Sequence, residues 1–210
     1  MKIQIFKNND MGQNTYLYYD ENTNDGVIID AGCSEADISA LSSFINEGNI
    51  TIRWLLLTHG HFDHIIAAGE IAGITSATVC AHEAEKEMLK APDINLSPRI
   101  GRELIVKPGI FFNDGCDINF GGAKLKILHT PGHTPGGVCY YDGANNNLFT
   151  GDTLFKESIG RTDLPAGNQD ELIRNIKQKL LTLPGCTNVY PGHGPSTTIS
   201  REKQHNPFIK

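Results

Sequence analysis

The chain has 210 residues, of which 39% are hydrophobic and 20% charged, and this is enough apolar material for one buried core. We therefore expect a single domain spanning residues 1–210. The formal net charge of −6 disfavours binding to nucleic acid or to an anionic membrane surface. No apolar run reaches the roughly 20 residues that span a bilayer, and the N-terminal residues lack the apolar segment of a secretion signal, so we expect a cytoplasmic protein.

The N-terminal part of the chain alternates short apolar segments with turn residues. Runs rich in β-branched and aromatic residues predict strands at 2–6, 15–19 and 26–29. Apolar residues at helical spacing predict a helix over 35–47. A nearly continuous apolar run at 52–57 is typical of a strand that is buried on both faces.

The rest of the chain contains further strands and helices separated by glycine and proline. Residues 91–109 hold three prolines and little periodicity, and we expect a long surface loop or lid there. Periodic segments predict helices at 65–72, 83–90 and 169–181 and strands at 78–81, 116–120, 124–129, 137–141, 147–150 and, last, 187–190. This mixture of strands and helices indicates an α/β protein.

Cysteine usage bears on both the compartment and the metal chemistry. The five cysteines are an odd number, lie far apart and include no C-x-x-C pair; they are Cys33, Cys80, Cys116, Cys139 and Cys186. We therefore expect neither a disulfide framework nor a thiolate zinc site, and we interpret these residues as small apolar side chains in a reducing compartment.

The strongest signal is a cluster of polar residues directly after the strand at 52–57. His59-x-His61-x-Asp63-His64 places three imidazoles and a carboxylate within six residues. A solvated turn would account for polarity here, but turn geometry favours Asn, Ser or Gly over histidine. The pattern therefore predicts metal ligands at the carboxyl end of a strand.

Three further residues of the same kind follow predicted strands. They are His133, Asp152 and His193, and each has a glycine neighbour that lets the backbone turn tightly and approach a bound group. With the first cluster they make five histidines and two aspartates, a donor set suited to zinc, iron or manganese. Seven ligands are too many for one tetrahedral ion and sufficient for two, which could hold a water between them and lower its pKa. This is the nucleophile of a hydrolase.

These motifs resemble the metallo-β-lactamase superfamily over essentially the whole chain. Within it, the segments 130–137 (TPGHTPGG), 150–155 (TGDTLF) and 160–165 (GRTDLP) are most similar to short bacterial hydrolases of the glyoxalase II type, also called hydroxyacylglutathione hydrolases. The resemblance implies a four-layer αββα sandwich, with two mixed β-sheets between outer helices and the metals at one edge. Since the chain ends soon after His193, we expect no C-terminal helical substrate domain of the kind that glyoxalase II carries.

The resemblance also implies a ligand set for two divalent ions, with zinc expected and iron or manganese as alternatives. The first ion would take His59, His61 and His133, the second would take Asp63, His64 and His193, and Asp152 would lie between them. Asp63 and Asp152 would then act in catalysis as ligands that orient the nucleophile. Tyr140 and Arg161 are similar to substrate-binding positions of the family.

The expected reaction is hydrolysis of a small anionic thioester. The sequence does not predict an oligomeric state. A thiol leaves as thiolate without a proton donor, which suits a site whose acids are all metal ligands. Two alternatives stay open. A persulfide dioxygenase would use a single iron held by His59, His133 and Asp152, and a metal-binding domain would hold ions without turnover.

Overall fold

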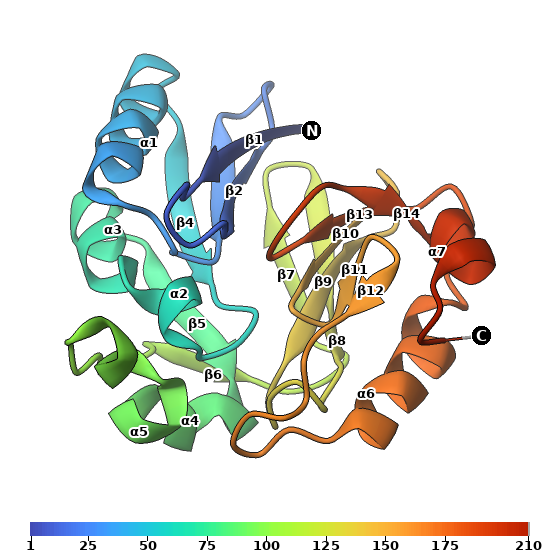
Figure 1. Cartoon of the computed structure of the whole chain (residues 1–210). Coiled ribbons are helices and arrows are strands. Elements are labelled where there is room, and N and C mark those ends of the chain that lie inside the picture. Colours follow the sequence, from blue (N-terminus) through green and yellow to red (C-terminus); the bar gives the residue numbers. More distant parts are fainter. Residues whose placement is uncertain (210) are drawn as a thin grey trace.

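A computed structural model describes residues 1–209 and contains two six-stranded β-sheets packed face to face, with helices on their outer surfaces (Figure 1). The first sheet has the order β1 (Lys2–Lys7), β2 (Asn14–Tyr19), β3 (Asp25–Ile29), β4 (Thr51–Leu56), β5 (Thr78–His82) and β6 (Ile110–Phe112). Its first three strands are antiparallel and the strands from β3 to β6 are parallel. Within residues 1–209, no helix is long and apolar enough to cross a membrane.

The second sheet is mostly antiparallel. Its order is β14 (Thr197–Thr198), β13 (Asn188–Pro191), β10 (Asn147–Gly151), β9 (Val138–Asp142), β8 (Ala123–His129) and β7 (Asp117–Phe120). Only the pairing of β10 with β13 is parallel among these strands of the described chain. A separate hairpin of β11 (Leu154–Phe155) and β12 (Ser158–Ile159) follows β10. Both sheets are therefore mixed, and the architecture is the αββα sandwich of the metallo-β-lactamase fold.

The space between the sheets is filled by aromatic and aliphatic side chains. Tyr18 and Phe149, from opposite sheets, are fully buried and their rings lie 5.3 Å apart. Tyr16 also packs against Phe149 at 5.3 Å. These contacts fix one sheet against the other, and the site described below lies at one edge of this pair.

Helices α1 (Glu35–Glu47) and α3 (Ala68–Thr75) cover the first sheet (Figure 1). The prediction for 35–47 is confirmed: Ser34 and Asp37 form a capping box, and the helix buries Ile38, Leu41 and Ile45. The single helix predicted at 65–72 is replaced by α2 (Phe62–Ile65) and α3, because Ala67 leaves helical geometry between them.

The long surface loop or lid expected at residues 91–109 is present only in part. The first half of this range contains α5 (Pro92–Asn95) and the 3₁₀ turn η2 (Ser97–Ile100), whereas residues 101–109 contain no helix or strand and are mostly exposed, and the short strand β6 follows. The buried Asn95 donates its side-chain N–H to the Leu104 carbonyl at 2.8 Å, and the Val106 N–H donates to the Leu89 carbonyl at 2.9 Å. The first bond lies within the segment, and the second fastens the segment to α4 (Lys86–Lys90). Helix α4 and the preceding η1 (Glu83–Glu85) occupy the predicted helix at 83–90.

The C-terminal part covers the second sheet and extends beyond the last predicted strand. The helix predicted at 169–181 consists of α6 (Gln169–Asn175) and the π-helical segment η3 (Ile176–Leu180). After β13 the chain forms β14 and α7 (Ile199–His205), so the strand predicted at 187–190 is not the last strand of the chain. Helix α7 contributes one buried aliphatic residue, Ile199, and a buried Glu202, a pattern that hydrophobic periodicity does not detect.

Candidate metal centre

The polar cluster after the strand at 52–57 lies where β4 leaves the first sheet. The last apolar residues of this strand, up to Leu57, are buried, and the chain then turns into a short loop before α2 begins at Phe62. His59 and His61 lie in the loop, whereas Asp63 and His64 lie in the first turn of α2. The residue spacing thus distributes the four side chains over a loop and a helix that face one edge of the sandwich.

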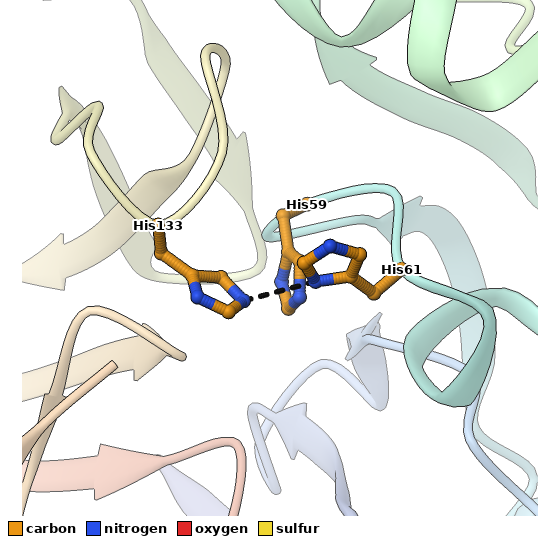
Figure 2. Close-up of side chains that lie close together, drawn as sticks. All are labelled: His59, His61 and His133. Atoms are coloured by element: carbon orange, nitrogen blue, oxygen red, sulfur yellow. Dashed lines mark hydrogen bonds between the residues drawn. The ribbon is translucent and has the colours of Figure 1, made fainter. Parts of the chain in front are cut away.

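A first group of three side chains is completed from the other sheet. His133, in the loop between β8 and β9, points at His59 and His61, as Figure 2 shows. The Nδ1 atom of His61 and the Nε2 atom of His133 are 2.9 Å apart, and all three residues are at most 3% exposed. One nitrogen from each ring lies within 4.8 Å of the other two, which is a suitable spacing for a shared ion. We call these residues the first ligand group.

A second group contains Asp63, His64 and His193. The Nε2 atom of His193, which follows β13, is 3.1 Å from the Asp63 Oδ2 atom and 3.3 Å from the His64 Nε2 atom. Their ligand atoms also lie within 4.8 Å of one another. Unlike the first group, this one reaches the surface, since the His193 side chain is 28% exposed. We call these residues the second ligand group.

Asp152 lies between the two groups, directly after β10. Its Oδ1 atom is 3.3 Å from the His64 Nε2 atom, and its Oδ2 atom is 3.6 Å from the His133 Nε2 atom. The backbone at Gly192 passes very close to the Asp152 carboxylate. A Cβ added at Gly192 would lie 2.4 Å from the Asp152 Oδ1 atom, so only glycine fits beside this carboxylate.

The unpaired atoms of this edge show that the residues fit a divalent metal. Among the described residues, three buried ligand-group atoms have no hydrogen-bond partner, namely the Nε2 atoms of His59 and His61 and the Oδ1 atom of Asp152. Buried polar atoms rarely stay unpaired, because each would lose the bonds it makes in water. Imidazole nitrogens and carboxylate oxygens converging in this way are a donor set for zinc, iron or manganese.

Hydrogen bonds from outside the two groups orient the rings. Asp30 accepts from the Nδ1 atom of His64 at 2.8 Å and also accepts two bonds from Thr58. The backbone carbonyl of Arg161 accepts from the Nδ1 atom of His133 at 2.7 Å. In each case the other nitrogen, Nε2, is directed into the site, which fixes the tautomer that binds metal. Sequence reasoning missed Asp30, although its position after the buried strand β3 resembles that of the predicted ligands.

The electrostatics of His59, His61 and Asp152 favour the protonation states that bind metal, whereas the carboxylates of Asp30, Asp152 and Asp63 raise the pKa of His64 against the effect of burial. Burial and then the neighbouring His64 hold the pKa of His59 well below its usual range, and burial with His133 lowers the pKa of His61 to about 3. Burial alone would raise the pKa of Asp152, but the adjacent histidines, His64 first, bring it below its usual range. At neutral pH these groups are thus neutral imidazoles and a carboxylate, the forms that coordinate metal.

The two predicted substrate-binding residues are placed differently from the ligands. Tyr140 is fully buried between the sheets, where its hydroxyl donates to the Leu57 carbonyl at 2.7 Å, so it has no exposed face for a substrate. The strand alternation of β9 directs this side chain inward. The Arg161 side chain is exposed and paired with Asp163, at 2.8 Å between Nη2 and Oδ2. Its backbone carbonyl, in contrast, belongs to the site through His133.

This fold and this site define a class. The family model described as Metallo-beta-lactamase superfamily matches residues 8–193, and the chain belongs to that superfamily. One relative is named a probable metallo-hydrolase, and both ligand groups of this chain could hold a metal ion.

Relatives within the superfamily support a glyoxalase II-like subfamily. The chain is 35% identical to hydroxyacylglutathione hydrolase GloC of Haemophilus influenzae, covering 100% of this chain and 98% of that protein. It is 39% identical to an uncharacterized protein of Mycobacterium tuberculosis, over 94% of this chain and 92% of the relative.

Solved structures show the same fold. The BLEG-1 B3 metallo-beta-lactamase matches with a TM-score of 0.91 and 37% identity over 100% of both chains. ETHE1 from Myxococcus xanthus matches with a TM-score of 0.79 and 31% identity, over 99% of this chain and 84% of that one. TTHA1623, solved in a di-iron-bound form, matches with a TM-score of 0.79 and 34% identity, over 93% and 94%.

Proposed function

We propose that this protein is a binuclear metal-dependent hydrolase that cleaves a small anionic thioester, in the manner of a hydroxyacylglutathione hydrolase. The observation that carries the proposal is the position of Asp152, whose two oxygens face His64 on one side and His133 on the other. One carboxylate between two ligand groups is the arrangement expected for a pair of ions about 3.5–4 Å apart. The similarity to GloC supports the thioester.

The residues present can be assigned to this chemistry. His59, His61 and His133 would hold one ion, and the second ligand group would hold the other. When bound, two divalent ions supply a water of lowered pKa and polarise the carbonyl that it attacks. Asp63 and Asp152 would orient that water as hydrogen-bond acceptors, since the lowered pKa of both carboxyls keeps them ionised.

The leaving group follows from the acids that the site offers. The carboxylate of Asp63 lies 3.1 Å from His193, and that of Asp152 lies 3.3 Å from His64, so both already face histidines. The nearby carboxylate of Asp30 accepts bonds from Thr58 and His64, so it has no proton to give. An amine or alkoxide would need a proton donor, whereas a thiolate, with a thiol pKa of about 8.5, leaves unaided. This difference favours a thioester.

A second candidate is a persulfide dioxygenase with a single iron. His59, His133 and Asp152 form a set of two histidines and one carboxylate, the ligand type of non-haem iron oxygenases. The structure of TTHA1623 in a di-iron-bound form supports iron as an alternative to zinc at a two-ion site.

Metal analysis combined with two assays separates these candidates. Apoprotein is reconstituted with zinc or with iron, its metal content is measured, and thiol release from a panel of thioesters is compared with oxygen uptake on glutathione persulfide. The proposal expects two ions per chain and thiol release without oxygen uptake. Oxygen uptake by protein with one iron per chain would establish the second candidate instead.

The remaining expectations are part of the same proposal. We propose a single domain over residues 1–210 acting in the cytoplasm, and the five free thiols are consistent with a reducing compartment. The exposed Arg161 side chain is a candidate contact for an anionic substrate, since the backbone carbonyl of the same residue accepts from His133.

A further inference from the structure

Glu85 is a buried carboxylate outside the two ligand groups. It ends the 3₁₀ turn η1 after β5 and is 1% exposed. Its Oε2 atom accepts from the Gly60 N–H at 2.9 Å, and its Oε1 atom accepts from the Gly136 N–H at 2.7 Å. One side chain thus binds the backbone of two separate loops, with a different oxygen for each.

These two loops carry the whole first ligand group. Gly60 lies between His59 and His61, and Gly136 lies in the same loop as His133. The first loop leaves the first sheet after β4, whereas the second joins β8 to β9 in the other sheet. The distance between the two loops therefore sets the distance between His133 and its partner rings.

The backbone of both loops packs tightly against Glu85. A Cβ added at Gly60 would lie 2.9 Å from the Glu85 Oε2 atom, and one added at Gly136 would lie 2.5 Å from the Glu85 backbone nitrogen. Both loops thus approach this residue as closely as glycine allows. A buried carboxylate is costly unless it is hydrogen-bonded, and bonds to a charged acceptor are the stronger kind.

We propose that Glu85 is a positioning residue that holds the two loops at the separation at which His59, His61 and His133 can share one ion. The inference rests on the metal centre of the proposed function and does not depend on its substrate. The metal affinity of the first ligand group should depend on Glu85. The second ligand group has no contact with this carboxylate among the described residues, so its metal affinity should not.

The test is zinc binding to apoprotein, measured by competition with a chelator, for Glu85→Gln. A glutamine keeps one acceptor oxygen but turns an N–H group toward the other loop, so one of the two bonds is lost. The fold should survive, because the Val138 N–H also donates to the Thr58 carbonyl at 2.9 Å and joins the same segments. Outer partners of ligands are typically worth ~10- to 100-fold in metal affinity.

Two backgrounds separate the ligand groups. In His193→Ala, which leaves the first group intact, Glu85→Gln should weaken zinc binding by ~10- to 100-fold. In His61→Ala, which leaves the second group intact, it should change the affinity by less than about threefold, within ordinary context dependence. Equal losses in both backgrounds, or no loss in either, would overturn the inference.

Glu202→Gln is the matched control. Glu202 is also fully buried and accepts from the Glu157 N–H at 2.9 Å and from the Asn206 side chain at 2.8 Å, but it lies in α7. We expect it to lower the apoprotein's melting temperature without changing zinc affinity in either background. A comparable loss of zinc affinity here would reduce Glu85 to a general stability effect. Zinc binding with no thioester turnover would contradict only the proposed substrate.

Discussion

The two ligand groups differ in how they meet solvent and in how the chain supports them. His59, His61 and His133 are nearly inaccessible. The Nδ1 atom of His59 lies 3.1 Å from the Thr58 hydroxyl, and the Nδ1 atom of His133 donates to the Arg161 carbonyl. In the second group, Asp63 and His193 have side chains that are 18% and 28% exposed. His64 is the exception, since it is fully buried and bonded to Asp30.

This difference assigns separate tasks to the two halves of the centre. The first half is preorganised, because its rings are buried and because burial lowers the pKa of His59 and of His61, which keeps these two imidazoles neutral. The second half faces solvent and carries the carboxylate of Asp63, so a substrate and its leaving group can reach it. Asp152 belongs to both halves, and the largest effects should follow from its removal.

Asp152→Ala should impair both halves of the centre at once. It removes the carboxylate between the two ligand groups and leaves the histidines of both without their shared partner. We expect turnover of a thioester to fall by at least about a thousandfold, since bound metals contribute several kcal/mol of transition-state stabilisation. Metal content and thiol release are measured together. Full metal content with full turnover would contradict the role of this residue.

His61→Ala and His193→Ala allow the metal affinity of the two halves to be compared. Each removes one ligand, so each should lower the saturating metal content from about two ions per chain to about one. The buried first group has no solvent nearby to replace a lost ring, so we expect the larger loss of affinity for the ion at that group, in His61→Ala. Elemental analysis after equilibration with zinc provides the comparison. A greater loss of metal affinity in His193→Ala would contradict the description of the first half as the preorganised one.

Asp30→Asn tests the buried part of the second half. Asparagine can still accept from Thr58 but binds the His64 Nδ1 atom less strongly than a carboxylate does. We expect metal affinity at the second group to fall by ~10- to 100-fold, with the first group unaffected. Chelator competition in the His61→Ala background measures the zinc affinity of the second ligand group. Unchanged affinity would show that Asp30 does not orient His64.

The smallest effect concerns a buried histidine that is not in either ligand group. Burial, followed by the stacked ring of His129 at 3.9 Å, lowers the pKa of His82 to about 4. The unfolded chain binds this proton near pH 6.5 and the folded chain only near pH 4, so stability is lost as pH falls through that interval.

His82→Asn should therefore reduce the acid-dependent loss of stability. Asparagine can still cap η1, as the His82 Nδ1 atom does by accepting from the Ala84 N–H. We expect a change of about 1 kcal/mol or less, because solvent reaches the partly exposed His129 and screens the interaction. Urea unfolding of the apoprotein at pH 7 and pH 5 measures it. An identical loss in both proteins would contradict this explanation.

Residue type and strand-end position were sufficient to predict which side chains meet at this edge. The structure brings all seven together, because the strands that precede them end at the same edge of the two sheets. The groups that orient them were not predictable in this way. Asp30 and Glu85 act through contacts between segments far apart in the chain, and Arg161 acts through a backbone carbonyl that has no sequence signature.

Short elements were missed for a related reason. The three residues of β6 and the two of β14 are too few for a periodicity to be read, and pairing with neighbouring strands defines them. The fold class, in contrast, was predictable from long apolar segments such as β4 and from the motifs themselves. Tyr140 shows the limit of motif similarity, because its position matched the family while the strand placed its ring in the core.

Metal stoichiometry tests the central claim most directly. Apoprotein is equilibrated with excess zinc, freed of unbound metal and analysed by elemental analysis, with Asp152→Ala treated in parallel. We expect about two zinc ions per native chain and fewer than one in the variant, since two ligand groups share this carboxylate. Saturation of the native chain at one ion or none, or an unchanged content in Asp152→Ala, would contradict a binuclear centre built around Asp152.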